Sequence, residues 1–164
     1  MAQTVRVALP ATKQLRDLLE NQVGREVSLR PTYPLPASGR RLAFAIYVDD
    51  HLTTRALVVV DLPAAAYIGA AAGLVPVGVA TTAVQEHALP ALLTDRLREV
   101  ATGWTQLFAG PGSADQIRLY SLLLPGDTPP NDIVALAAAP GRRTDLIVSV
   151  RAYGEGHLSV VMGR

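Results

Sequence analysis

Four polar residues recur at helical spacing between Ala91 and Phe108. Asp95, Glu99, Thr102 and Gln106 are separated by four, three and four positions, and such steps place side chains on one face of a helix. They bring two carboxylates, a hydroxyl and an amide to that face. The other side of the segment is apolar, with residues mostly three or four positions apart: Leu93, Leu97, Val100, Trp104, Leu107 and Phe108. Spacing alone therefore favours an amphipathic helix with an ordinary solvent-facing side.

Three histidines are the next candidates, as metal ligands. His51, His87 and His157 lie 36 and 70 residues apart, so they do not form the closely spaced pair that many metal sites place on one helix. Asp49 and Asp50 precede His51, and two adjacent carboxylates could bind a divalent cation. Adjacent residues of a strand point to opposite faces, however, and acidic pairs are common in hairpin turns. The sequence therefore predicts a turn here and no metal site.

Other catalytic motifs are missing from the sequence. Ser121, Ser149 and Ser159 lie in strand patterns, without the GxSxG turn of a nucleophilic serine. No glycine group has the GxGxxG or GxxxxGK[ST] spacing of a phosphate-binding loop. The pairs Arg40-Arg41 and Arg142-Arg143 fit solvated loop tips at least as well as contacts with an acidic partner or with nucleotide phosphates. We therefore expect no cofactor and no nucleotide site.

The composition narrows the class of protein further. The chain has 164 residues, a formal net charge of +1, 49% hydrophobic residues, 18% charged residues and no cysteine. A net charge this close to zero argues against a nucleic-acid binder, because phosphate contacts need a surplus of Lys and Arg. Without cysteine there is no disulfide framework and no thiolate site. We expect one domain over residues 1–164, located in the cytoplasm.

One uncharged stretch, Leu62–Val84, is long enough to cross a bilayer as a single helix. It consists mostly of small residues and Thr, Pro63 and Pro76 interrupt it, and no basic cluster flanks it. We therefore expect no membrane span. The stretch is better explained by a helix from Leu62 to about Leu74, followed by a short apolar segment that reaches His87.

Capping residues, glycines and prolines elsewhere in the sequence predict where helices and strands begin and end. Thr12 is placed to cap a first helix that Gly24 ends, and Pro90 opens the strongest helix, which Gly110-Pro111-Gly112 closes. The residues from Ile133 to Ala139 form a short helix or an extended segment. The expected strands are Glu26–Arg30, Leu42–Val48, Ala56–Val60, Ile117–Leu124, Asp145–Ala152 and His157–Met162, the last two joined by a turn at Gly154-Glu155-Gly156.

These strands follow one another as hairpins and do not alternate strictly with helices. We therefore predict an α+β protein with a mainly antiparallel sheet covered by helices. Asp61 is placed as the N-cap of the helix that follows the strand at Val58. Within that helix, Gly69 and Gly73 leave a smooth face, which predicts close packing against the sheet or another helix.

Two segments carry a resemblance to a known family. An apolar strand runs into an Ala-rich helix with an acidic start in VVVDLPAAAYI (residues 58–68), and LTDRLREVATGW follows at residues 93–104. With the order of elements, from Leu15 to the last strand, these segments resemble the CheC/CheX family of chemotaxis phosphatases. In that family a long helix carries an acidic residue and, three positions later, an Asn. The carboxylate engages the lysine of a phosphorylated CheY-type response regulator, and the Asn amide orients the attacking water.

On this resemblance, Glu99 matches the acidic position and Thr102 stands where Asn is expected. A threonine hydroxyl reaches less far than an amide and lacks its paired donor and acceptor. The resemblance thus implies Asp95, Glu99 and Gln106 as partner contacts and Glu99 with Thr102 as the catalytic positions. Gln106 could also supply an amide from one turn further along.

Three functions remain open at this point. The first, which we prefer, is a catalytically silent CheX-like domain that binds a receiver domain or another signalling protein, or that forms a homodimer through its sheet or the Leu62–Leu74 helix. The second is a divergent phosphatase, in which Glu99 docks the receiver and Thr102 or Gln106 orients water. The third is a structural domain whose polar face has no partner.

Overall fold

The computed structural model describes residues 7–35, 41–108 and 116–163. Its helices are α1 (Thr12–Val23), α2 (Leu62–Ala72), α3 (Val77–Glu86), α4 (Ala91–Gly103), the 3₁₀ turn η1 (Trp104–Leu107) and α5 (Asn131–Ala138). Its strands are β1 (Val27–Pro31), β2 (Leu42–Val48), β3 (Thr54–Asp61), β4 (Arg118–Leu123), β5 (Arg143–Val150) and β6 (Gly154–Met162). Each strand expected from the sequence is present, with its ends shifted by a few residues at most.

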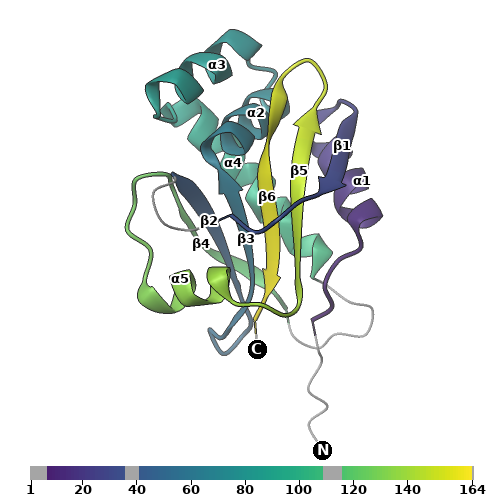
Figure 1. The fold of residues 1–164 in the computed structure, drawn as a ribbon, viewed down its shortest axis with the longest axis vertical. Helices are drawn as coiled ribbons and strands as arrows, with labels where there is room; N and C mark the ends of the chain where they lie inside the picture. The colour runs from purple at the N-terminus through teal and green to yellow at the C-terminus, as the bar shows by residue number, and fades with distance from the viewer. Residues whose placement is uncertain (1–6, 36–40, 109–115, 164) are drawn as a thin grey trace, which may run out of the picture.

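The strands form one six-stranded sheet in the order β1-β5-β6-β3-β2-β4, and every neighbouring pair is antiparallel (Figure 1). β2 pairs with β3 and β5 pairs with β6, as consecutive hairpins. The two edges of the sheet are β1 and β4. An antiparallel sheet built from hairpins and covered by helices is the α+β architecture that the sequence predicts, and this prediction is confirmed.

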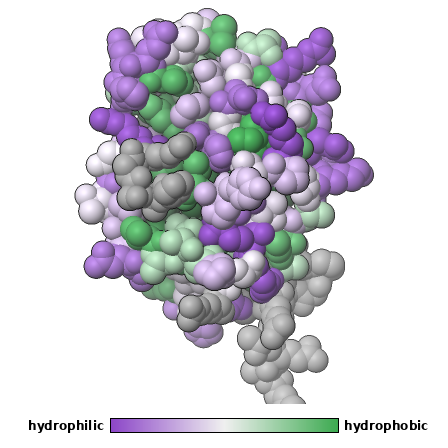
Figure 2. Space-filling model, in the orientation of Figure 1, coloured by the Kyte–Doolittle hydropathy of each residue, from purple (hydrophilic) through white to green (hydrophobic). Residues whose placement is uncertain are grey.

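The two faces of the sheet are covered unequally. Alternate residues of a strand point to opposite faces, so Ala45 and Tyr47 belong to the core with α1, α2 and α4, whereas Phe44 and Ile46 belong to the core with α5. Figure 1 shows α1, α2 and α4 on one side of the sheet and α5 over the lower part of the other side. Above α5 this second side is largely hydrophilic (Figure 2), so it needs no helix to cover it.

The start and the packing of α2 follow from its sequence. Asp61 caps the helix, because its Oδ1 accepts a hydrogen bond of 2.9 Å from the Ala64 amide. At Gly69 a Cβ atom would lie 2.8 Å from the backbone oxygen of Leu93, so the missing side chain lets α2 approach α4 closely. Eight residues of α2 are buried. The helix α2 is therefore packed largely inside the domain, and the expected homodimer stays a prediction.

Two expectations about helices are wrong. Thr12 does not cap α1: it is the first residue of the helix, and Ala11 takes the N-cap position without a side-chain hydrogen bond. The segment Val77–Glu86, expected as a short apolar stretch, forms α3, in which only Ala80 and Ala83 are buried. Because valine, alanine and threonine are spread around this helix, it has no distinct apolar face from which a helix could be predicted.

Two boundaries also differ from the expected ones. α4 ends at Gly103 and the chain tightens into η1, so the last turn of the expected helix is a 3₁₀ turn. The Gly110-Pro111-Gly112 stop expected after it lies outside the described residues. In the last hairpin Val150 pairs with Gly154. The turn is therefore made by residues 151–153, and Gly154 to Gly156 belong to β6.

The uncharged stretch Leu62–Val84 is divided between two helices. α2 ends at Ala72 and α3 begins at Val77, with Leu74 between them at a positive φ of 54°. In the parts of the chain that the structure describes, no helix has both the length and the apolar character needed to cross a membrane.

Of the Arg142-Arg143 pair, Arg142 is exposed in the bend before β5, as expected of a loop tip, whereas Arg143 is not solvated, contrary to the expectation. The Arg143 side chain is only 10% exposed, and it donates to both carboxylate oxygens of Asp145, at 2.8 and 3.0 Å. It also donates to two carbonyl groups at the end of α5. Arg142 donates to the carbonyl of Val7. Both arginines therefore hold neighbouring segments on the sheet, a role that sequence spacing does not reveal.

Candidate partner-binding site

Three of the polar residues at helical spacing lie together on one exposed face of α4. The side chains of Asp95 and Glu99 are 72% and 69% exposed, and Thr102 is exposed as well. The opposite face is buried against α2 and the sheet, through Leu93, Thr94, Leu97, Val100 and Ala101. We refer to the exposed residues Asp95, Glu99 and Thr102 as the α4 stripe.

A buried tyrosine and a half-buried glutamine from two other elements hold the end of α4. The Tyr47 hydroxyl of β2 donates to the carbonyl of Ala101 at 2.5 Å, and the Gln22 amide of α1 donates to the carbonyl of Val100 at 2.9 Å. The Trp104 indole N–H donates to the side-chain oxygen of Gln22 at 3.0 Å. Burial raises the pKa of Tyr47 well above its ordinary value, so its hydroxyl remains a donor. These bonds fix the α4 stripe relative to the sheet, because carbonyls at a helix end accept further donors.

Each carboxylate of the α4 stripe has an arginine three positions away. Glu99 accepts a hydrogen bond from Arg96 at 3.2 Å, and Asp95 lies 3.8 Å from Arg98. Exposed pairs of this kind contribute little, on the order of 0.5 kcal/mol or less. A cation on another protein can therefore compete for either carboxylate, so the stripe is suited to bind a lysine or an arginine.

The Thr102 hydroxyl is committed to its own helix. Its Oγ1 donates to the carbonyl of Arg98 at 2.8 Å, and the Oγ1 of Thr105 donates to the carbonyl of Thr102 at 2.9 Å. A threonine hydroxyl has one hydrogen to donate, so at this position only its lone pairs remain for an external group. A water molecule held here would have no second anchor of the kind that the donor and acceptor of an amide provide.

Gln106 is exposed, but it does not continue the column of Thr102. It lies in η1, where residues three apart eclipse one another, as the buried pair Trp104 and Leu107 do. The same geometry aligns Gln106 with Gly103, roughly 100° around the helix axis from Thr102. The tightened turn therefore rotates Gln106 away from the α4 stripe, which the α-helical spacing of the sequence did not anticipate.

Asp49 forms the hairpin turn that its position predicts. Its Oδ1 accepts hydrogen bonds from the backbone amides of His51 and Thr53, at 2.9 and 3.0 Å. Burial raises the pKa of Asp49, but the two backbone bonds and the guanidinium of Arg55 outweigh it and hold the pKa below its ordinary value. Among the described residues, no three His, Asp or Glu side chains are grouped so that they could hold a metal ion.

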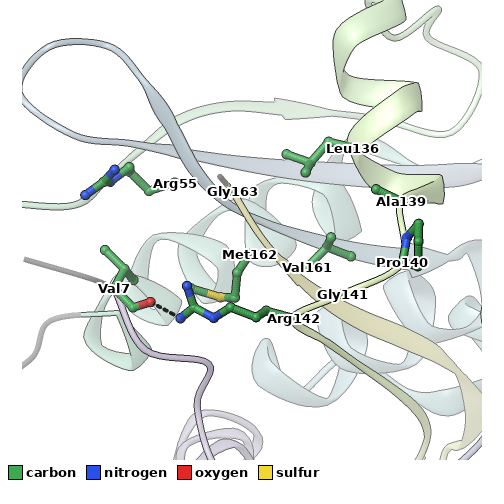
Figure 3. A pocket seen from close by; sticks show the side chains of 10 residues that line it. All are labelled: Val7, Arg55, Leu136, Ala139, Pro140, Gly141, Arg142, Val161, Met162 and Gly163. Atoms are coloured by element: carbon green, nitrogen blue, oxygen red, sulfur yellow. Dashed lines mark hydrogen bonds between the residues drawn. The ribbon is translucent and has the colours of Figure 1, made fainter.

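A hollow of about 450 Å³ lies beside the end of β6 and is lined in part by Arg55 and Arg142 (Figure 3). Figure 3 shows the Arg142 guanidinium turned to the Val7 carbonyl, to which it donates. Arg55 lies 3.5 Å from the carboxylate of Asp49. Both cations thus have protein partners, and apart from Arg142 none of the residues considered in the sequence as site candidates lines this hollow.

No protein-family model matches the chain and no curated protein matches its sequence, but solved structures match its fold. The FliM middle domain from H. pylori has a TM-score of 0.61 at 6% identity, over 92% of this chain and 83% of that one. A CheC-like superfamily protein from Shewanella sp. PV-4 has a TM-score of 0.52 at 13% identity, over 99% and 100% of the chains. The CheX-CheY-BeF3-Mg2+ complex from Borrelia burgdorferi matches with a TM-score of 0.50 at 10% identity, over 90% of this chain and 92% of that one.

The chain has the CheC/CheX-like fold. At these identities the likeness concerns the fold alone, and it confirms the architecture that the resemblance implies. The roles of Glu99, Thr102, Asp95 and Gln106 stay predictions, since they depend on chemistry that a shared fold does not determine.

One feature of this face was missed in the sequence. The edge strand β4 lies beside α4, and residues 117–122 line a groove of about 470 Å³ together with Arg98, Thr102 and Thr105. Tyr120, which is 63% exposed, belongs to this groove. The contact of a helix with an edge strand arises from tertiary packing, and no local periodicity reports it.

Proposed function

We propose that this chain is a CheX-like signalling domain that binds a response-regulator receiver domain through the α4 stripe and does not hydrolyse its aspartyl phosphate. The likeness in fold to CheX, which was solved as a complex with CheY, supports a receiver domain as the partner. A FliM structure with a TM-score of 0.58 was solved as a complex with SpeE. Proteins with this fold thus serve as platforms for other proteins.

Glu99 is the residue through which we expect the receiver to dock. Its carboxylate is exposed on a helix whose end is held by the Tyr47 and Gln22 hydrogen bonds. Its pairing with Arg96, at 3.2 Å across exposed side chains, is weak enough for a partner's lysine to replace. A rigid helix that presents an exposed carboxylate is therefore a suitable anchor for a cationic group.

The observation that carries the proposal of a silent site is the hydrogen bond from Thr102 to the carbonyl of Arg98. Orienting a water for in-line attack needs a group that both accepts from the water and restrains it from a second direction. The Thr102 hydroxyl already donates its only hydrogen within the helix, and Gln106 lies in η1, where 3₁₀ geometry does not continue the α-helical column of Thr102. The α4 stripe therefore keeps the docking carboxylate but lacks the amide.

Binding of receiver domains tests the first half of the proposal. A panel of receiver domains, each loaded with BeF3 and Mg2+, is titrated with the wild type and with Glu99→Ala. We expect the wild type to bind at least one of them and Glu99→Ala to weaken that binding about tenfold or more. Glu26→Ala is the matched control, because its exposed carboxylate precedes β1 and pairs with Arg151. Absence of binding to every receiver at high micromolar concentration would contradict the proposal.

Phosphate release tests the second half. Receivers charged with acetyl phosphate should lose phosphate at the same rate with and without the wild-type protein. A faster release that Glu99→Ala abolishes would show that the alternative, a divergent phosphatase acting on an aspartyl phosphate, is correct.

A further inference from the structure

Exposed apolar side chains gather around α3. Seven large hydrophobic residues are exposed in the described part of the chain, and four of them lie between the end of α2 and the first turn of α4. Leu74 is 81% exposed and Leu92 is 50% exposed, with Val77 and Val79 between them in sequence. Scattered exposed apolar residues are normal, but several in one region mark a contact surface. We call these four residues the α3 patch.

A groove opens in the same region. It has a volume of about 450 Å³, and Val79, Leu89 and Pro90 contribute apolar walls while Thr82 and Glu86 contribute polar groups. The groove exists because α3 packs on the rest of the molecule mainly through α2, by way of Ala80 and Ala83. Two alanines bring the helix close to its support but leave its outer sides without cover.

The α3 patch is continuous with the α4 stripe. Leu92 precedes Asp95 by three positions and Glu99 by seven, so it stands on the same face of α4, one turn before the first carboxylate. Gly73 joins the regions from the other side, since a Cβ there would lie 2.8 Å from the Cγ of Arg96. A protein that covers Glu99 and extends toward the start of α4 therefore meets Leu92 first and the groove next.

The size and charge of the surface point to one occupant. A stable dimer needs about 800 Å² from each partner, and four side chains beside one small groove are too few to supply it alone. Carboxylates lie along the path, with Glu86 at the groove and Asp95 and Glu99 on the stripe, where Arg98 and Arg96 pair with them only weakly. The surface therefore suits a partner that presents a cation next to an apolar side chain.

We propose that the receiver domain that docks on the α4 stripe also inserts an apolar side chain into the groove between α3 and the start of α4. This inference rests on the proposed function and adds a specificity determinant to it. Glu99 supplies charge that many receivers can satisfy, whereas the groove admits only those with an apolar side chain at the matching distance from the cation.

Charge placed in the groove, at Val79, and on the path to it, at Leu92, tests the inference. A receiver that binds the wild type in the BeF3 and Mg2+ titration is measured against Val79→Glu and Leu92→Glu, and against Leu92→Ser as a milder change. We expect both glutamate variants to weaken binding about tenfold and Leu92→Ser about threefold. Leu52→Glu is the control, since Leu52 is 58% exposed in the β2–β3 hairpin, at the opposite end of the molecule from α3 (Figure 1). Thermal unfolding of each variant checks that the fold is kept.

The outcomes separate this inference from the proposed function. Loss of binding in Glu99→Ala together with unchanged binding in Val79→Glu, Leu92→Glu and Leu92→Ser would overturn the inference and leave the proposed function standing. Failure of the wild type to bind any receiver would overturn both. Sedimentation that shows a homodimer, dissociated by Val79→Glu while receiver binding is unchanged, would identify a second copy as the occupant and also overturn the inference.

Discussion

At the scale of single residues, the proposed function depends on what Glu99 and Thr102 of the α4 stripe present to solvent. Glu99 is exposed and weakly paired, which leaves its charge accessible. Thr102 is three positions away, on the same face, but its hydroxyl donates to its own helix at the Arg98 carbonyl. This hydrogen bond supports the proposal that Thr102 does not act as an amide would, because the single donor of its hydroxyl is already used within the helix.

Restoring an amide at position 102 should create activity. In Thr102→Asn the side chain no longer needs to bond to the helix backbone, and its amide can both donate to and accept from a water on the exposed face. We expect phosphate release from a bound, phosphorylated receiver to rise at least about tenfold above that with the wild type, which corresponds to about 1.4 kcal/mol of barrier. Thr81→Asn is the matched control, because Thr81 is an exposed threonine of α3 whose hydroxyl likewise donates to the carbonyl four positions earlier, that of Val77 at 3.1 Å. Unchanged release in Thr102→Asn despite normal receiver binding would mean that more than the amide is missing.

At the scale of elements, the position of α4 depends on how closely α2 approaches it. The Gly69 backbone faces the carbonyl of Leu93, and a row of buried alanines along α2 keeps the remaining distance short. Tyr47 and Gln22 then hold the other end of α4 by its carbonyls. The site is therefore carried by a helix that is fixed at both ends and free only on its outer face.

Adding one methyl group at this contact should separate the helices. In Gly69→Ala the new Cβ meets a backbone oxygen at 2.8 Å, which no rotation of a side chain relieves, so we expect a loss of about 1–3 kcal/mol in the free energy of unfolding. Gly78→Ala in α3 is the matched control, since nothing lies within 4 Å of its Cβ position. That variant should be neutral or up to about 0.5 kcal/mol more stable. Urea unfolding measures both, and equal stabilities would disprove the close contact.

At the scale of the whole molecule, a network of polar side chains connects α5 to the sheet. Arg143 of β5 bonds to Asp145 and to the end of α5, and the Ser159 hydroxyl of β6 donates to Asp145 at 2.6 Å. Burial raises the pKa of Asp145, but the hydrogen bonds from Arg143 and Ser159 outweigh it, so its pKa lies below the ordinary value.

This network should make stability fall in acid. Because the pKa of Asp145 is lower in the folded state, its contribution is fully present above the unfolded value, near 3.9, and is lost as pH falls through the folded pKa. We expect Asp145→Asn to be about 1–3 kcal/mol less stable than the wild type at pH 7. Between pH 4 and pH 2.5 the two should converge, since the wild type loses stability more steeply. Urea midpoints over this range measure the effect, and parallel curves would refute the assignment.

Local patterns in the sequence determined most of the helices and strands and one face of the site. Strand alternation, the Asp61 cap and the apolar period of α4 each depend on neighbours within about two helical turns, which a single sequence displays directly. The exposed positions of Asp95, Glu99 and Thr102 follow from the same period. The α+β class followed as well, because hairpin spacing limits how consecutive strands can pair.

Tertiary structure alone decided the rest. The sequence of α3 has no distinct apolar face, and the helix packs on α2 through Ala80 and Ala83. The tightening into η1, which turns Gln106 away, and the burial of Arg143 against Asp145 depend on partners distant in sequence or on exact backbone geometry. The grooves beside β4 and α3 also depend on tertiary structure. A groove is the space between packed elements, and the periodicity of a single segment does not reveal it.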